Sequence, residues 1–456
     1  KTQGKQFEGT AFRIQVDVLD CLGCGNCVDV CPGKKGQSAL EMVPITTQYD
    51  NQKNWDYMVQ HVSSKAHLVD TKLNVKNSQF AKPLFEFSGA CSGCGETPYI
   101  KLITQLYGDR MMIANATGCS SIYGASAPST PYTKNEEGKG PSWANSLFED
   151  NAEFGFGFVI AQASMRNRVG DLMQKARKSA DFSDSQKELF AQWIENKDNG
   201  EAIKEISAQI VGVLTGMENE IAKEILSLEK YLTKKSIWVF GGDGWAYDIG
   251  FGGLDHVLAM GQDINVLVLD TEVYSNTGGQ SSKSTPTAAV AKFAAAGKRI
   301  RKKDLGMIAA TYGYVYVAQV AMGANQAHYL KALKEAEEYN GPSLIIAYSP
   351  CISHGLRSGM GMAQTEQKKA VECGYWSLWR YNPKLEEEGK NPFVLDSKEP
   401  DWSKFRDFLM GEVRYTQLVK SFPHEADELF EAAKENAQWR YRSYQRMANA
   451  HFGSVD

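Results

Sequence analysis

One stretch of this sequence, residues 236–280, constrains the fold more than any other. It opens with the β-branched and aromatic run 236–240, which predicts a buried strand and stops at a glycine turn. A segment with helical spacing in its second half follows, then the apolar run 264–270 and a polar loop. Strands that alternate with helices predict an α/β fold with a doubly wound, mostly parallel sheet.

Both polar turns of this stretch follow directly after strands, where ligands bind in parallel α/β sheets. Gly242 and Gly244 would let the backbone approach a diphosphate, and Asp243 between them can hold a divalent cation that bridges its oxygens. Thr271 and Asn276 lie one strand further on, where a hydroxyl and an amide oxygen could complete an oxygen-only shell suited to Mg²⁺. A Gly-Asp-Gly turn alone is equally well explained as a structural turn.

The pair of turns resembles the thiamine diphosphate motif, in which Gly-Asp-Gly is followed by a later loop that contains Asn. The string Tyr-Ser-Asn-Thr-Gly-Gly-Gln-Ser-Ser-Lys-Ser-Thr-Pro-Thr at residues 274–287 is similar to that of pyruvate:ferredoxin (flavodoxin) oxidoreductases. The resemblance covers essentially the whole chain, and it is least specific in the helical residues 159–234 and in the last helices. It implies a thiamine diphosphate-binding fold.

Nine cysteines are present, and an odd number in tight clusters favours metal binding over a disulfide framework. Residues 12–18 alternate between apolar and polar, which predicts a strand. Residues 21–32 after them have the spacing Cys-x2-Cys-x2-Cys-x3-Cys-Pro, which is that of bacterial ferredoxins. It predicts that Cys21, Cys24 and Cys27 ligate one 4Fe-4S cluster, while Cys31 serves the other cluster of a pair. Four packed thiols or a zinc site would explain this spacing less well.

Only one copy of this motif occurs, and the chain lacks an initiator Met. We therefore expect the second copy upstream of Lys1, in an N-terminal remainder of the same polypeptide. Residues 1–65 are expected to form the C-terminal half of a ferredoxin-like domain with two 4Fe-4S clusters. Residues 66–456 are expected to form a domain that binds thiamine diphosphate, Mg²⁺ and a proximal 4Fe-4S cluster, with a helical insertion at about 159–234 and a helical tail at about 377–456.

Four further cysteines follow strand-like runs, at glycine or proline turns: Cys91 and Cys94 follow a run that begins at residue 85, Cys119 follows the run 111–115, and Cys351 follows the run 343–349. If those strands are parallel, all four thiols converge on one edge of the sheet. From the residues alone, a lone Cys-x2-Cys pair could be a redox disulfide, a zinc half-site or a cluster half-site. The other two cysteines could equally be buried free thiols.

Pyruvate:ferredoxin oxidoreductases hold a cluster near thiamine diphosphate with similar Cys-x2-Cys-Gly-Glu, Thr-Gly-Cys and Pro-Cys-x-x-His-Gly motifs. The resemblance therefore implies that Cys91, Cys94, Cys119 and Cys351 ligate a proximal 4Fe-4S cluster. Cys373 has no partner left, and we expect a core thiol there.

The resemblance also implies a set of cofactor contacts. Asp243 and Thr271, with the backbone carbonyl of Val273, would hold Mg²⁺ on the diphosphate. Asn276 would face the substrate carbonyl and is the catalytic candidate, and Ile122 is expected to support the bent cofactor. The other candidates for cofactor binding are Glu96, Cys119, Gly242, Gly244, Trp245, Glu272, Tyr274 and Ser275.

The activity implied is the oxidation of pyruvate with coenzyme A to acetyl-CoA and CO2, with electrons passed through three 4Fe-4S clusters to ferredoxin or flavodoxin. The hydroxyethyl intermediate that pyruvate forms on thiamine diphosphate must lose two electrons, and a cluster accepts one at a time, so a proximal cluster and further clusters are needed. The groups that activate the aminopyrimidine and bind pyruvate and coenzyme A are expected in the N-terminal remainder. This chain alone should therefore be inactive.

Composition excludes other classes. The 50 Lys and Arg residues against 54 Asp and Glu residues give no nucleic-acid footprint. No apolar run reaches membrane-spanning length and no signal peptide is present, so we expect a cytoplasmic protein without a membrane partner. The family suggests a homodimer.

Two alternatives remain open. One is a different 2-oxoacid:ferredoxin oxidoreductase, acting on 2-oxoglutarate or on a branched-chain or aromatic 2-oxoacid, although the string at 274–287 favours pyruvate. The other is an electron-transfer module without thiamine chemistry, in which the Gly-Asp-Gly turn is structural. A non-redox thiamine diphosphate lyase is disfavoured because it would have no use for eight clustered thiols.

Overall fold

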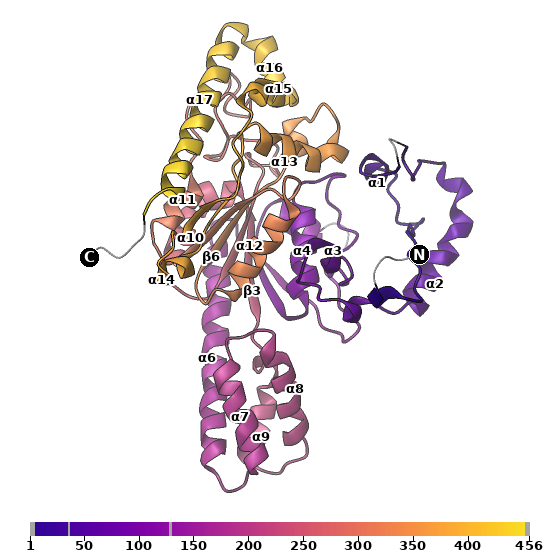
Figure 1. Ribbon diagram of the computed structural model, residues 1–456, viewed down its shortest axis with the longest axis vertical. Coiled ribbons are helices and arrows are strands. Elements are labelled where there is room, and N and C mark those ends of the chain that lie inside the picture. The colour runs from indigo at the N-terminus through magenta and orange to yellow at the C-terminus, as the bar shows by residue number, and fades with distance from the viewer. Residues whose placement is uncertain (1–4, 35–36, 127–129, 452–456) are drawn as a thin grey trace.

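The computed structural model describes residues 5–34, 37–126 and 130–451. The described residues build one eight-stranded sheet in the order β2-β1-β3-β4-β6-β5-β7-β8, with helices against it (Figure 1). The strands from β2 to β5 in this order run parallel, and β7 and β8 extend the sheet in antiparallel pairings. The strands are β1 (Met111–Ala116), β2 (Ser142–Ser146), β3 (Ser236–Gly242), β4 (Asn265–Asp270), β5 (Tyr316–Val320), β6 (Ser343–Tyr348), β7 (Trp379–Tyr381) and β8 (Phe393–Leu395).

The central strands are apolar nearly throughout because both of their faces are covered. Every residue of β4 and of β6 is buried, as is typical of parallel strands between two helix layers. The strands predicted at residues 236–240, 264–270, 111–115 and 343–349 are present as β3, β4, β1 and β6. The α/β fold with a mostly parallel sheet is therefore confirmed.

Alternate residues of each strand enter two different cores. In β3, Val239 packs in a core with Leu254 and Leu305, whereas its neighbour Trp238 packs on the other face with Tyr99 and Leu333. One face of the sheet is thus covered by α10, α11 and the last helices, and the other by α4 and α12. The helices of this body are α4 (Thr97–Tyr107), α5 (Cys119–Ser121), α10 (Phe251–Ala259), α11 (Leu305–Ala310), α12 (Gln326–Glu338), α13 (Ala363–Glu372), α14 (Pro383–Glu387), α15 (Phe405–Met410), α16 (Val413–Ser421) and α17 (Pro423–Ala448).

A helical unit projects from the sheet between β2 and β3 (Figure 1). It has its own core, in which the indole of Trp193 donates to the carbonyl of Leu232 at 3.0 Å and the Arg166 guanidinium lies over the ring. The helices expected in residues 159–234 are present, and the first begins earlier than expected. They are α6 (Asn151–Lys178), α7 (Asp184–Asn196), α8 (Ala202–Leu214) and α9 (Glu220–Ser227).

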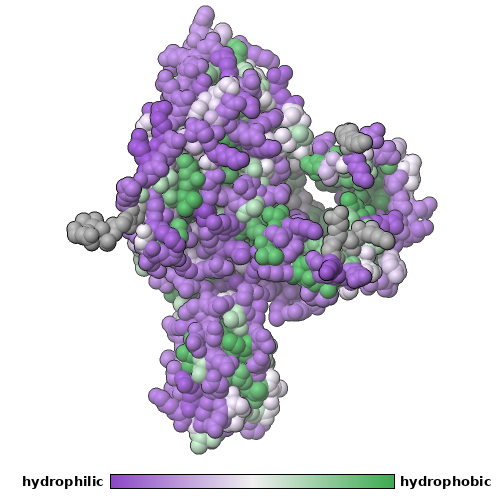
Figure 2. Space-filling model, viewed as in Figure 1, coloured by the Kyte–Doolittle hydropathy of each residue, from purple (hydrophilic) through white to green (hydrophobic). Residues whose placement is uncertain are grey.

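The N-terminal segment contains only short helices beside the body: α1 (Asn26–Asp29), α2 (Gln52–His61) and α3 (Val75–Ser78). The strand predicted at residues 12–18 is wrong for this structure, because no described segment pairs with it. A strand needs a hydrogen-bonding neighbour, and alternation alone does not supply one. Phe12 is left 71% exposed, and Figure 2 shows apolar surface on this side of the molecule.

Residues 285–296 follow the polar loop and are rich in alanine, which predicts a helix, but they form turns instead. Ala288 and Phe293 have positive φ angles of 72° and 66°, which no helix contains. The backbone N–H of Lys292 donates to the carbonyl of Gly279 at 2.9 Å. Pairing with a distant loop therefore overrides the helix propensity of alanine.

The strand-like run before Cys91 is also weaker than predicted, since only a single bridge joins Phe85 to Tyr132. In the tail, the helices predicted near residues 402–410 and 424–450 are present as α15 and α17, with α16 between them. None of the helices in the described residues is long and apolar enough to cross a membrane. Residues 1–4 and 452–456, which the two expected domains include, lie outside the described residues.

Candidate cofactor and cluster site

The two polar turns meet because β3 and β4 are neighbours in the sheet. One oxygen of the fully buried Asp243 carboxylate accepts the backbone N–H of Thr271 at 3.1 Å, and the other accepts the Ser282 hydroxyl at 2.6 Å. The Thr271 hydroxyl lies 3.0 Å from Asp243 Oδ1 and 3.0 Å from the carbonyl oxygen of Val273. The Thr271 hydroxyl therefore lies beside both of the other oxygens that are expected to hold Mg²⁺.

This donor set fits a hard divalent cation, which prefers carboxylate, hydroxyl and carbonyl oxygens. Burial raises the pKa of Asp243 well above its usual range, and the nearby Asp270 charge raises it further. A bound cation would offset this accumulation of negative charge, because opposite charges nearby favour the ionised form.

The Gly-Asp-Gly turn after β3 packs tightly against the polar turn after β4. A Cβ atom on Gly244 would lie 2.6 Å from the Tyr274 ring, so no larger residue fits there without movement. Gly244 also opens the helical segment Gly244–Ile249, which continues into α10. The free N–H groups at the start of a helical segment are suited to an anion such as a diphosphate.

Two adjoining cavities lie at this edge of the sheet. The smaller, of about 110 Å³, is lined by Gly242, Gly244, Trp245, Val273 and Tyr274 among others. The larger, of about 260 Å³, is lined by Ile122, Thr271 and the second group of cysteines, which are Cys91, Cys94, Cys119 and Cys351, among others. Both cavities share four of the predicted contacts: Glu96, Cys119, Ser275 and Asn276.

Glu96 and Cys119 stand at the boundary of the two cavities. The buried Glu96 carboxylate accepts the Tyr123 hydroxyl at 2.8 Å, and burial raises its pKa to about 7. Cys119 Sγ lies 3.3 Å from the Ser275 hydroxyl, and burial raises the pKa of this thiol to about 12. When nothing is bound, the Cys119 thiol is therefore expected to be neutral near pH 7, whereas Glu96 exchanges its proton in that range.

The four cysteines Cys91, Cys94, Cys119 and Cys351 all line the larger cavity. Cys119 and Cys351 follow the parallel strands β1 and β6, as the sequence predicts. Within the described residues, no three His, Cys, Asp or Glu side chains are arranged to hold a metal ion. Four thiols spread around one cavity are consistent with a larger group, because a cluster of four irons separates its thiolates more widely than a single ion does.

The first group of cysteines lies on the surface. Cys21, Cys24 and Cys27 are exposed and Cys31 is half-buried. The helix α1, which carries Cys27, contacts the turn Met360–Met362. A Cβ atom on Gly361 would lie 2.2 Å from the Asp29 carboxylate, and one on Gly93 would lie 2.3 Å from the Met360 carbonyl oxygen. This turn therefore lies between the two groups of cysteines, while Cys373 is buried in the core as a free thiol.

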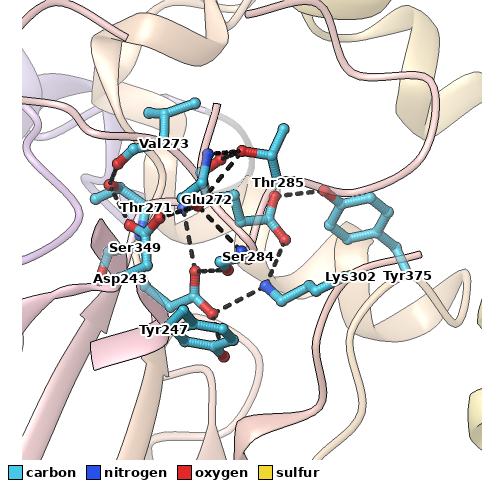
Figure 3. A network of polar contacts seen from close by, with 12 residues as sticks. Asp243, Tyr247, Thr271, Glu272, Val273, Ser284, Thr285, Lys302, Ser349 and Tyr375 are labelled. Atoms are coloured by element: carbon cyan, nitrogen blue, oxygen red, sulfur yellow. Dashed lines mark hydrogen bonds and ion pairs between the residues drawn. The ribbon is translucent and has the colours of Figure 1, made fainter. Parts of the chain in front are cut away.

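Two of the cofactor candidates line neither cavity: Asp243, which contacts Thr271 at the wall of the larger cavity, and Glu272. The side chain of Glu272 is buried in a polar network beneath the turn, where it contacts Lys302 and Tyr375 (Figure 3). Burial alone would raise its pKa, but Lys302 and Arg414 lower it to about 2. The side chain therefore points away from the cavities, and the prediction that Glu272 binds the cofactor stays a prediction.

Sequence reasoning missed several residues that support the site: Ser282, Lys302, His354 and Arg414. His354 follows Cys351 in the same loop and is fully buried, and its Nε2 donates to the carbonyl of Thr271 at 2.7 Å. Burial and the Arg414 charge lower its pKa to about 3, so the ring is neutral. The Pro-Cys-x-x-His-Gly motif contained this residue, but Lys302 and Arg414 carry no local signal.

Comparisons with known proteins agree with this geometry. The model of the family "Thiamine pyrophosphate enzyme, C-terminal TPP binding domain" matches residues 209–347. The pyruvate:ferredoxin oxidoreductase of Moorella thermoacetica is 56% identical over 453 residues, which are 98% of this chain and 38% of that protein. The pyruvate-flavodoxin oxidoreductase of Klebsiella pneumoniae is 56% identical over 439 residues, which are 96% of this chain and 37% of that protein.

A solved 2-oxoglutarate:ferredoxin oxidoreductase from Magnetococcus marinus is matched with a TM-score of 0.33 and 16% identity, over 72% of this chain and 88% of that one. A likeness this low does not establish a common fold. The chain spans less than two-fifths of the length of its curated relatives, at high identity along nearly all of its own length. Over nearly its whole length it matches one part of the pyruvate:ferredoxin and pyruvate-flavodoxin oxidoreductases.

Proposed function

We propose that the polypeptide containing this chain oxidises pyruvate with coenzyme A to acetyl-CoA and CO2, and that ferredoxin or flavodoxin accepts the two electrons. The names of the relatives and the thiamine diphosphate domain support this activity. One observation carries the proposal within this chain. The oxygens of Asp243, Thr271 and Val273 converge beside a cavity that contains four cysteines and Asn276.

In this proposal Asp243, Thr271 and the carbonyl of Val273 hold Mg²⁺ on the diphosphate, and Gly242 and Gly244 let the backbone approach the phosphates. When bound, thiamine diphosphate supplies a carbanion that adds to the 2-oxo group and an electron sink for decarboxylation. The residues of the chain bind this cofactor and orient it.

Asn276 lines both cavities, so its amide would lie between the cofactor and the cluster ligands and would donate a hydrogen bond to the substrate carbonyl. Glu96, Trp245, Tyr274 and Ser275 line the wall against which the cofactor would rest. Of these residues, Glu96 and Trp245 are buried, and this part of the wall would keep water from the cofactor.

The second group of cysteines, which lines the larger cavity, would hold a proximal 4Fe-4S cluster beside the cofactor. Cys21, Cys24 and Cys27 would hold one outer cluster, and Cys31 would reach the other. Electrons would then pass from the buried cavity to the exposed cysteines, and from there to the acceptor. Free thiols in tight clusters suit the reducing cytoplasm, where we place the enzyme as a homodimer.

The test is to mix the complete enzyme with 2-oxoacids under anaerobic conditions and to follow the visible absorbance of the clusters. Pyruvate should bleach them and release CO2, and coenzyme A should increase the rate. Faster bleaching by 2-oxoglutarate or a branched-chain 2-oxoacid would favour the other 2-oxoacid oxidoreductases. Clusters that respond to no 2-oxoacid, in protein that contains no thiamine, would instead indicate an electron-transfer module.

A further inference from the structure

Glu272 has a left-handed backbone, with a φ angle of 59°, although it is not a glycine. Residues with a Cβ atom rarely adopt this conformation, because the Cβ comes too close to the neighbouring carbonyl oxygen. Such outliers persist only where the surrounding structure enforces them. Glu272 lies in the chain between Thr271 and Val273, which supply two of the three proposed magnesium ligands.

The left-handed residue has a direct geometric consequence for the metal ligands. In an extended chain, successive residues point to opposite sides of the backbone. Here the chain reverses at Glu272, and the Thr271 hydroxyl comes within 3.0 Å of the Val273 carbonyl oxygen. The conformation of Glu272 therefore sets the spacing of two of the three proposed magnesium ligands.

The side chain of Glu272 is anchored from two distant parts of the sequence. Its Oε1 accepts Lys302 Nζ at 2.9 Å, and its Oε2 accepts Arg414 Nη2 at 2.9 Å and the Tyr375 hydroxyl. The side chains of Glu272, Lys302 and Arg414 are 1%, 6% and 1% exposed. Hydrogen bonds to charged groups without competing water are strong, so these contacts hold the carboxylate firmly.

The backbone of Glu272 is held as well. Its N–H donates to Asp270 at 3.1 Å, and its carbonyl oxygen accepts the Thr285 hydroxyl at 2.5 Å. Figure 3 shows the side chain directed toward Lys302 and Tyr375, while Thr271 and Val273 lie on the opposite side of the chain. Lys302, Arg414 and Tyr375 do not line either cavity, and all three contact the carboxylate of Glu272.

We propose that Glu272 is a positioning residue. Lys302 and Arg414 hold it in the left-handed conformation, and this conformation keeps the Thr271 hydroxyl and the Val273 carbonyl directed toward Asp243 before a divalent cation binds. The inference rests on the proposed function, which assigns that cation site to the magnesium diphosphate.

The test compares Glu272→Ala with Glu272→Gly in the complete enzyme. Both variants remove the carboxylate, and both leave Lys302 paired with Asp270 and Arg414 paired with Glu412. Only glycine adopts a positive φ angle without strain. Binding is measured by Mn²⁺ titration in the presence of thiamine diphosphate, with free Mn²⁺ followed by electron paramagnetic resonance.

We expect Glu272→Ala to weaken Mn²⁺ binding about tenfold, which is the affinity equivalent of the strain that alanine meets in the left-handed region. Glu272→Gly should bind severalfold more tightly than Glu272→Ala. The control Glu337→Ala removes another buried partner, that of Arg110, and should leave Mn²⁺ affinity unchanged. Unchanged cluster absorbance and circular dichroism verify that each variant is folded.

Equal weakening by alanine and glycine would overturn the inference, because the carboxylate itself would then be the important group. Wild-type affinity in Glu272→Ala would overturn it as well. If the wild-type enzyme binds no Mn²⁺ with thiamine diphosphate, the proposed function fails together with the inference. If the wild type binds and the two variants do not differ, only the inference fails.

Discussion

Replacing Asp243 with asparagine should stabilise the enzyme without its cofactor and remove its stabilisation by the cofactor. Asp243 is fully buried beside a second carboxylate, that of Asp270. A buried charge near a like charge costs free energy unless a cation compensates it. Asparagine has almost the same shape and removes the charge.

The hydrogen bonds of the site can survive this substitution. The amide oxygen can accept from Thr271, as Asp243 Oδ1 does at 3.1 Å and 3.0 Å, and the amide nitrogen can donate to the Ser282 hydroxyl. Relieving a charge kept for function typically raises stability by about 0.5–2 kcal/mol. Cofactor at about 100 times its Kd stabilises a protein that binds it by about 2.7 kcal/mol. Without cofactor, the Asp243→Asn variant should therefore be more stable than the wild type. With cofactor, the wild type should be the more stable of the two.

Differential scanning calorimetry of the complete enzyme, with and without Mg²⁺ and thiamine diphosphate, measures this reversal of stability. Asp270→Asn is the matched control, because Asp270 pairs with Lys302 at 2.9 Å. Breaking one partner of a buried pair costs about 3–5 kcal/mol, so this variant should unfold at a lower temperature. If Asp243→Asn unfolds earlier than the wild type and still gains as much from the cofactor, Asp243 does not hold the metal.

Two further predictions concern the cysteine groups. Cys351→Ala should lower the iron and sulfide content of the purified enzyme by one cluster. The control Cys373→Ala removes a thiol that is buried in the core and should leave this content unchanged. An equal loss in both variants would contradict the ligand assignment. Gly93→Ala would place a methyl group 2.3 Å from the backbone carbonyl oxygen of Met360 and should displace the turn Met360–Met362, which α1 contacts. Hydrogen exchange in residues 21–31 should then increase, and Gly212→Ala, whose added methyl group meets open space, is the control that should show no change.

The sheet was predictable because its central strands are continuous apolar runs that end in glycine, proline or polar turns. From that order alone, the ends of β3 and β4 could be expected to meet, and the structure brings Asp243 and Thr271 to 3.0 Å. The convergence of Cys119 and Cys351 on one cavity follows from the same rule for parallel strands.

The errors arose where distant contacts override local preference. The alanine-rich residues 285–296 have a high helix propensity, but pairing with the loop at Gly279 holds them in turns. The alternation at residues 12–18 predicts a strand, and a strand requires a partner. The cofactor contact of Glu272 stays a prediction, and no local pattern reveals that its carboxylate pairs with Lys302 and Arg414.

The most direct test is a crystal structure of the complete enzyme with thiamine diphosphate and Mn²⁺ in place of Mg²⁺, measured at a wavelength at which manganese and iron scatter anomalously. We predict a manganese peak between the Asp243 carboxylate, the Thr271 hydroxyl and the Val273 carbonyl, and iron among Cys91, Cys94, Cys119 and Cys351. A diphosphate bound elsewhere, or a larger cavity without iron in enzyme that is active, would contradict the account.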